Sequence, residues 1–482
     1  MKLKSWIAPL FGVLILVFFL GSNPIAPLTE LGMKVVGIFL FTIIWWVTVG
    51  VGYPSILSIL LLALTGVMKP NDAFAASWGN WVPLFVIGSF GLSECLRITG
   101  FSRRFALWFV TRPFVAGRPW MLVTMFLTAN ILLGSVMPLT PTCVIFMAIA
   151  EPMLLALGYK KGDAFAAMLM MGIAWISTVA AGMTPIGQTG NMMMIDWVRT
   201  DLKFSINFLQ WMGFGIPTGL LVLAAMLLIF RYLVRVDVSR VKNMATDYVR
   251  AEMGKMGPMK LEEKLALAIF LGVVLIWMAP SFIGGISPGV KTYLDNMGFA
   301  VPPLLGACLM CLVAVKGKPL LGFKEWMFGG VEWATIALLA AIFAISAVIA
   351  KPETGIPDLL NQVFKPLAAG ASLTTLVIIT VVWVVLQTNA MSNIITETIV
   401  YRIMVPIFVA SGMGNAAALG AVISAASNAA FALPSATPPT AIASGSGWVP
   451  VGFMAKYGAL MIVPTIIIFA VVGYPLAAFL FW

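Results

Sequence analysis

The chain has 482 residues, of which 61% are hydrophobic and 10% are charged. Soluble domains carry about 25% charged residues, so this composition excludes a soluble globular protein and predicts an integral membrane protein. We attribute the net charge of +11 to loops beside apolar runs and expect no nucleic-acid partner. Because the chain has no histidine and no acid pair with a clear nucleophile, we do not expect an enzyme.

Apolar runs long enough to cross about 30 Å of hydrocarbon recur along the chain. The first follows Lys2 and Lys4 and resembles a secretory signal peptide, but no small-x-small cleavage site comes after it. We therefore expect residues 1–28 to hold a retained leading helix. Eleven full crossings are predicted, at about residues 5–22, 29–48, 53–67, 81–98, 163–198, 208–231, 264–281, 299–315, 332–350, 413–447 and 457–481.

Some apolar stretches are interrupted by polar residues. Residues 121–157 and 371–410 are too long for one helix and contain Pro, Thr or Asn near the middle, which predicts two re-entrant hairpins. The crossings at 163–198 and 413–447 are predicted to be broken helices. The expected fold class is an all-α integral membrane protein with about 11 transmembrane helices, two of them broken, and two re-entrant helical hairpins.

The placement of positive charge predicts the orientation in the membrane. If the N-terminus is cytoplasmic, most Lys and Arg fall in cytoplasmic loops, including five Arg between residues 97 and 118. Eleven crossings then put the C-terminus outside. We expect a multi-pass protein of the cell (inner) membrane.

The chain also shows an internal repeat. A polar segment at 237–263 is expected to be a cytoplasmic linker, partly helical, between halves at 29–236 and 264–482. The first half has five spans after the leading helix, so the second half inserts upside down, and both hairpin tips are expected near the midplane of the membrane. Polar residues recur 253 positions apart: Ser135 and Thr388, Thr140 and Asn393, and the steps Thr184-Pro185 and Thr437-Pro438.

Polar helix breaks at membrane depth have a specific chemistry. Free backbone N–H and C=O groups are tolerated there only where protein or a water-filled cavity satisfies them. The N-terminus of a half-helix suits an anion, and its carbonyl end suits a cation such as Na⁺. Because hydroxyl and amide side chains can serve either ion, the repeated breaks predict a transporter with a midplane site for a small anion and a cation.

Three segments carry a family resemblance. Residues 388–396 (Thr388-Asn389-Ala390-Met391-Ser392-Asn393-Ile394-Ile395-Thr396) resemble the second-hairpin signature of the divalent anion/sodium symporter (DASS) family, in which Ser-Asn-Thr follows a Thr four residues before the Ser. Residues 436–442 resemble its second broken-helix motif, Ala-Thr-Pro-Pro-Asn-Ala, and residues 184–191 resemble the first, Thr-Pro-Ile-Gly-Thr-Pro-Pro-Asn. The resemblance extends over nearly the whole chain in length, span count and motif order.

This resemblance implies secondary active transport of di- or tricarboxylates or another divalent anion such as sulfate, usually sodium-coupled, by a homodimer with elevator-type alternating access. One sodium site would comprise Thr388, Met391 (backbone), Asn393 and Ala436 (backbone). The other would comprise Ser135, Thr140 and Gly187. The substrate site would be lined by Ser392, Asn393, Thr437 and Pro438 with Thr140, Gly187 and Gln188.

The chain departs from the family pattern at both hairpins. The first reads Leu139-Thr140-Pro141 where Ser-Asn-Thr is expected, so one amide is missing, and Ile394 replaces the Thr of the second. Sodium binding in the first half is therefore open, and anion exchange or proton coupling on the same fold are the alternatives.

Simpler roles stand beside these interpretations. Polar residues at helix breaks can act only as caps, and Thr-Pro steps can be kinks. Among the intramembrane acids, Glu94 is expected to pair with Arg97. Glu397 is expected either to take part in proton coupling or to be buried with a hydrogen-bond partner. These acids and Glu151 would carry the function if the chain were a cation/proton antiporter or channel, which is the competing class.

Overall fold

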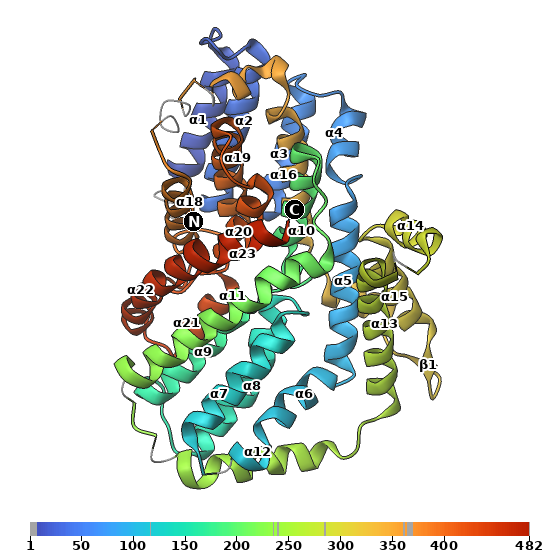
Figure 1. Ribbon diagram of the computed structural model, residues 1–482, viewed down its shortest axis with the longest axis vertical. Coiled ribbons are helices and arrows are strands. Elements are labelled where there is room, and N and C mark those ends of the chain that lie inside the picture. The colour runs from blue at the N-terminus through green and yellow to red at the C-terminus, as the bar shows by residue number, and fades with distance from the viewer. Residues whose placement is uncertain are drawn as a thin grey trace. The chain divides into compact units, whose positions relative to one another are not determined.

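The computed structural model describes residues 7–115, 117–234, 236–238, 241–283, 286–359, 362–363 and 370–481. Within these residues the chain is almost wholly helical, with one short pair of strands, which confirms the predicted all-α class (Figure 1). Lys2 and Lys4 lie outside the described residues.

The chain divides into two compact units. The first comprises Met1–Ile87, Val331–Leu376 and Arg402–Gly414, and the second comprises Gly88–Gly330, Val377–Tyr401 and Asn415–Trp482. Each unit combines segments from both predicted halves. The division of the chain at residues 237–263 therefore stays a prediction about the repeat.

The first unit is a group of packed helices. Helix α1 packs on α2, and α16 packs on α3 and α4. The α1–α2 contact needs a glycine, because a Cβ on Gly37 would lie 2.6 Å from the Cβ of Phe19. Thr29 caps α2 by accepting a hydrogen bond from the N–H of Gly32 at 3.1 Å. The helices of this unit are α1 (Ile7–Gly21), α2 (Glu30–Thr48), α3 (Gly52–Leu64), α4 (Pro70–Ser77) and α16 (Trp333–Ile349).

Most remaining elements belong to the second unit, and three helices contain residues of both units. The shared helices are α5 (Trp81–Ile98), α18 (Leu373–Thr388) and α19 (Asn393–Ser411). The elements wholly in the second unit are α6 (Phe101–Val110), α7 (Pro119–Gly134), α8 (Leu139–Ala156), α9 (Ala164–Ala181), α10 (Thr189–Leu202), α11 (Phe208–Ile229), α12 (Val241–Met256), α13 (Leu261–Ile283), α14 (Pro288–Met297), α15 (Val301–Leu312), β1 (Ala314–Val315), β2 (Lys318–Pro319), α20 (Ala416–Ser427), α21 (Pro438–Gly445), α22 (Val451–Ile467) and α23 (Tyr474–Leu480). The two strands pair antiparallel, with Ala314 opposite Pro319.

Helix α9 forms the centre of the second unit. Every residue from Phe165 to Ala181 is buried, so this helix is covered on all sides by protein. Helices α7 and α8 both pack against it, as Figure 1 shows. The polar residues that follow its C-terminal end are therefore attached to a helix that is buried on all sides.

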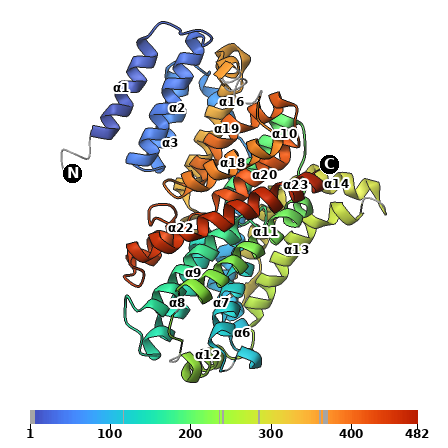
Figure 2. The ribbon, with the colours of Figure 1, turned by 60° about the vertical axis from the view of Figure 1, so that its left-hand side comes forward.

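The two predicted broken helices pack against each other reciprocally. The first consists of α9 and α10, and the second of α20 and α21. Helix α10 packs on α20, visible in Figure 2, and α21 packs on α9. The leading segment of each broken helix therefore contacts the trailing segment of the other.

Several helices are suited to a membrane. Among the described residues, eight helices are long and apolar enough to cross one, or up to nine if α14 and α15, bent by 76°, form a single crossing. This supports a multi-pass membrane protein. The count of eleven crossings and the re-entrant character of the hairpins depend on how the helices lie in a bilayer, and they stay predictions.

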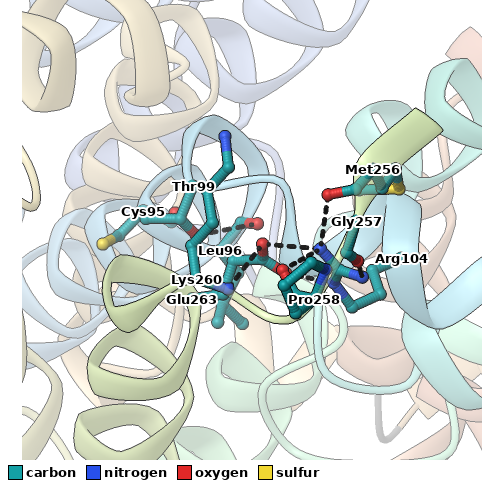
Figure 3. Close-up of polar contacts among 9 residues, drawn as sticks. All are labelled: Cys95, Leu96, Thr99, Arg104, Met256, Gly257, Pro258, Lys260 and Glu263. Carbon is teal, nitrogen blue, oxygen red and sulfur yellow. Dashed lines mark hydrogen bonds and ion pairs between the residues drawn. The ribbon is translucent and has the colours of Figure 1, made fainter. Parts of the chain in front are cut away.

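The predicted linker contains α12, so its expected helical part is present. Arg104 of α6 fixes the junction between α12 and α13 (Figure 3). Its guanidinium donates to Glu263 Oε2 at 2.5 Å, to Glu263 Oε1 at 2.9 Å and to the carbonyl oxygen of Gly257 at 2.7 Å. The hydrogen bond to Glu263 raises the pKa of Arg104 above its ordinary value, so the guanidinium stays charged in this buried position.

Candidate functional site

Four helix breaks gather in the second unit. They lie between α7 and α8, between α9 and α10, between α18 and α19, and between α20 and α21. Every residue predicted to bind sodium or substrate lies at or beside one of these breaks, so the structure places all of them in one compact unit.

The break between α18 and α19 holds a compact group of oxygens, which we call the Thr388 cluster: Thr388 Oγ1, Asn393 Oδ1 and the carbonyl oxygen of Ser427. Thr388 donates to Asn393 Oδ1 at 2.9 Å and also to the Ser427 carbonyl. Thr388 and Ser427 are fully buried, and Asn393 is 6% exposed. One hydroxyl hydrogen thus serves two acceptors, and an excess of neutral oxygens over donors fits a hard cation such as Na⁺.

Asn389 connects this break to the break between α20 and α21. Its Nδ2 donates to the carbonyl oxygens of Val385 at 2.7 Å and Ala429 at 2.9 Å. Its Oδ1 accepts from the N–H groups of Phe431 and Ala432 at 2.8 and 2.7 Å. Asn389 is not among the predicted site residues, although an amide inside an apolar run was a usable signal, because buried amides are retained where backbone groups need partners.

The sodium site predicted around Thr388 and Asn393 has two further members, Met391 and Ala436. Among the described residues, no hydrogen bond joins either of them to the Thr388 cluster. Ala436 is buried, and its N–H donates to the carbonyl oxygen of Leu433 at 3.2 Å. Met391 is half-buried, and its sulfur accepts from Gln387 Nε2 at 3.2 Å. Their backbone roles at a sodium site stay predictions.

The break between α9 and α10 is organised by Asn191. Its Nδ2 donates to the carbonyl oxygens of Ala181, the last residue of α9, at 2.8 Å and of Thr184, inside the break, at 2.7 Å. Its Oδ1 accepts from Ser424 Oγ of α20 at 2.9 Å. Thr184 in turn donates to the carbonyl oxygen of Ser135 at the first hairpin break.

The first predicted sodium set is less tightly assembled. Ser135 uses its hydroxyl to bond the carbonyl oxygen of Leu132 at 2.8 Å, and Thr140 is half-buried at the second position of α8. Gly187 is held close to the preceding helix, because a Cβ there would lie 2.6 Å from the Ala181 carbonyl oxygen. Among the described residues no side-chain hydrogen bond joins Ser135 to Thr140.

The predicted substrate residues lie at or beside all four breaks. Thr437 caps α21, with its N–H donating to Thr440 Oγ1 at 3.1 Å, and it is 6% exposed, whereas Pro438 is exposed. Ser392 is half-buried at the start of α19. The exposed ring of Pro438 therefore lies beside the capped, positive end of the α21 dipole.

Gln188 contacts an acid that the sequence analysis did not assign to the site. Its Nε2 donates to Glu397 Oε1 at 2.6 Å, and Ser427 Oγ donates to the same oxygen at 2.6 Å. Glu397 is fully buried on α19 and Gln188 is 7% exposed. Glu397 therefore has the buried hydrogen-bond partners that one of its two predicted roles requires, and its predicted role in proton coupling stays a prediction.

The other two acids have ordinary partners. Arg97 donates to Glu94 Oε2 at 2.7 Å and to Oε1 at 2.5 Å, which confirms the predicted pair. Glu151 Oε1 accepts from Trp448 Nε1 at 3.0 Å. Neither contact suggests a role beyond structure.

Comparison with known proteins identifies the family of this chain. A family model described as the sodium:sulfate symporter transmembrane region matches residues 2–482. Among curated relatives, the sodium-dependent dicarboxylate transporter SdcS of Staphylococcus saprophyticus subsp. saprophyticus is 25% identical over 486 residues, which cover 97% of this chain and 90% of that protein. The protein of the same name from Staphylococcus aureus (strain USA300) is 26% identical over 481 residues, with the same coverage of both chains. The chain therefore belongs to the sodium:sulfate symporter family, which is a family of transporters and not of enzymes.

Proposed function

We propose that this protein is a sodium-coupled secondary transporter of a small dicarboxylate. Family membership supports sodium-coupled anion transport, and the names of the relatives favour a dicarboxylate over sulfate. The observation that carries the proposal for this chain is the Thr388 cluster, where three buried oxygens share one hydroxyl hydrogen.

The cation would be held chiefly by Thr388 and Asn393. Both side chains supply oxygens, and they lie at a helix break where free backbone carbonyls are available. Backbone oxygens of Met391 and Ala436 complete this set in the proposal. Sodium supplies positive charge beside the substrate site, which lowers the cost of bringing an anion there.

The anion would be held at the breaks by neutral donors. Ser392, Asn393 and Thr437 would bind it from the second half, with Pro438 lining the site. Thr140, Gly187 and Gln188 would contribute from the first half. The position of these residues at the N-terminus of α21 supports this placement, because the positive end of the helix dipole favours negative charge.

The arrangement of helices supports alternating access through an inverted repeat. The reciprocal contacts, α10 with α20 and α21 with α9, are those expected when two copies of a broken helix meet head to tail. In this proposal the α7–α8 and α18–α19 pairs are re-entrant hairpins with tips near the midplane, and the protein works as an elevator-type homodimer. The N-terminus is cytoplasmic and the C-terminus outside, in the cell (inner) membrane.

Uptake into proteoliposomes tests the function. We expect labelled succinate or a related dicarboxylate to accumulate when sodium is outside and to stop when choline replaces it. Asn393→Ala should abolish uptake, because it removes one of the oxygens of the Thr388 cluster. Thr398→Val is the matched control on α19, since the Thr398 hydroxyl bonds only the carbonyl oxygen of its own turn, at Ile394.

Two results would contradict the proposal in different ways. If no dicarboxylate, citrate or sulfate is moved or bound, the transport of anions is wrong. If uptake is unchanged in choline and follows a pH gradient or a counter-substrate, the sodium coupling is wrong while the anion transport stands.

A further inference from the structure

Glu397 lies in an unusual environment for a carboxyl group. It is fully buried, and both of its hydrogen-bond donors, Gln188 Nε2 and Ser427 Oγ, reach the same oxygen, Oε1, each at 2.6 Å. No Lys or Arg forms an ion pair with it among the described residues. Burying a carboxylate without a compensating positive charge is costly.

The atoms that remain unsatisfied are both acceptors. Within the part of the chain that the structure describes, Glu397 Oε2 has no hydrogen-bond partner, and neither has the amide oxygen Oε1 of Gln188, the residue that bonds its other carboxylate oxygen. Buried polar atoms without partners are rare in folded proteins and often indicate a missing ligand. Two unsatisfied acceptors on a bonded pair of side chains fit a cation, whereas an anion or another acceptor could satisfy neither of them.

The carboxylate is held tightly against the first turn of α10. A Cβ on Gly190 would lie 2.2 Å from Glu397 Oε2 and 2.7 Å from Gln188 Nε2, so only glycine leaves room for the pair. This close approach limits the space around Oε2. The space and the ligand type suit a small ion bound by oxygens rather than a bulky organic cation.

We propose that Glu397 and Gln188 form a cation site for Na⁺, with Glu397 Oε2 and Gln188 Oε1 as its ligands. None of the residues predicted to hold sodium supplies these two oxygens. The site adjoins the Thr388 cluster through Ser427, whose carbonyl oxygen accepts from Thr388 and whose hydroxyl donates to Glu397.

The site has a consequence for substrate binding, which rests on the proposed function. Gln188 is predicted to line the substrate site, and an uncompensated carboxylate bonded to it would repel an anionic substrate. A cation on Glu397 removes that repulsion. Sodium would therefore bind before the anion. Transport would depend on sodium, because only a bound cation offsets the negative charge of Glu397.

Thermal unfolding of the purified protein in detergent tests the site without any transport assay. The wild type should be stabilised when sodium replaces choline, because a ligand bound to the folded state raises its stability. In choline, Glu397→Gln should have a higher Tm than the wild type, since it removes the uncompensated charge. Its sodium-induced shift should fall to half of the wild-type value or less, with the Thr388 cluster supplying the remainder.

Matched variants keep the test decisive. Gln188→Met removes the second ligand and should also reduce the sodium-induced shift, whereas Thr398→Val should keep the full shift. If both Glu397→Gln and Gln188→Met retain the wild-type shift, the site is refuted. If sodium has no effect on the wild type but lowering the pH in choline raises its Tm, Glu397 holds a proton and the sodium site is equally refuted.

The same variants separate this inference from the proposed function. Dicarboxylate uptake by the wild type tests the function alone, and it can fail while sodium still stabilises the protein through Glu397. If uptake occurs, Glu397→Gln should show a shallower dependence on sodium concentration than the wild type, with a lower Hill coefficient. An unchanged Hill coefficient, together with an unchanged thermal shift, would leave the transport function standing and the Glu397 site overturned.

Discussion

Ser424 donates to Asn191 across 2.9 Å, and this bond joins the two broken helices between residues 233 positions apart. Asn191 is fully buried, and its Nδ2 bonds the carbonyl oxygens of Ala181 and Thr184 at the break beside it. One side chain therefore closes one break and fixes it to the other helix.

We predict that Asn191→Leu is much more damaging than Ser424→Ala. The first leaves the carbonyl oxygen of Ala181 and the hydroxyl of Ser424 without these partners, at about 1–3 kcal/mol for each unsatisfied group, and it takes one of two donors from the Thr184 carbonyl, which keeps the N–H of Gly187 at 3.3 Å. The second leaves only the amide oxygen of Asn191 unpaired, at about 1–3 kcal/mol for that single group. Thermal unfolding and uptake of the two variants check this, and equal losses in both would show that Asn191 does not organise the break.

The positions of helices and breaks were largely predictable from local pattern. The apolar runs at 29–48 and 208–231 correspond to α2 and α11. A helix that crosses the hydrocarbon layer needs about 20 apolar residues, so the length of an apolar run predicts the length of the helix. The 253-residue spacing located Thr388 and Asn393, which the structure joins directly. The positions of helices and breaks depend on neighbouring residues or on the internal repeat, and both can be recognised from the sequence alone.

The contacts between distant segments were not predictable in the same way. Gln188 meets Glu397 over 209 positions, and no spacing rule relates a residue of α10's N-terminus to one in the second turn of α19. The sequence also did not show that Asn389 and Asn191 satisfy backbone groups rather than ligands. Such roles depend on tertiary packing, since the partner carbonyls are defined only when the helices break and meet.

Gly458 of α22 supports the break between α20 and α21. A Cβ at this position would lie 2.5 Å from the Cα of Ala432 and 2.6 Å from the carbonyl oxygen of Phe431. Both contacts are with backbone, which cannot rotate away as a side chain can. We predict that Gly458→Ala lowers the free energy of unfolding by about 1–3 kcal/mol, the usual cost of overpacking, and reduces uptake.

Gly452 on the same helix is the control for this prediction. A Cβ there has no atom within 4 Å, so Gly452→Ala should be neutral or slightly stabilising because alanine favours a helix. Tm and initial uptake rate would be measured for both variants. Identical behaviour of the two would mean that α22 does not constrain the break.

The Arg104–Glu263 pair holds the junction of α12 and α13. The side chain of Glu263 is 1% exposed and that of Arg104 is 11% exposed, so removing one partner leaves the other charge buried. We predict that Arg104→Met lowers the free energy of unfolding by about 3–5 kcal/mol. Arg103→Met is the control, since Arg103 is 55% exposed in its pair with Glu252 and such surface pairs contribute about 0–1 kcal/mol.

A double variant separates charge from packing at this junction. Glu263→Leu combined with Arg104→Met removes both buried charges, and part of the lost stability should return. Recovery should be incomplete, because Arg104 also bonds the carbonyl oxygen of Gly257. A double variant no more stable than Arg104→Met alone would show that the ion pair is not what holds the junction.

Gly190 is predicted to be required by the side chain of Glu397 rather than by the backbone of α10. A Cβ there would collide with Glu397 Oε2 at 2.2 Å, so Gly190→Ala should displace the carboxyl group and break its bond to Gln188. Without that collision alanine would be the better residue inside a helix. Gly190→Ala should therefore destabilise the wild type more than a Glu397→Ala background, where only the contact with Gln188 Nε2 at 2.7 Å remains, which gives a double-mutant coupling of about 0.5–3 kcal/mol. Gly272→Ala in α13, where no atom lies within 4 Å of the new Cβ, controls for helix propensity. If Gly190→Ala destabilises both backgrounds equally, the constraint comes from the backbone, and the close seating of Glu397 against α10 is not what requires the glycine.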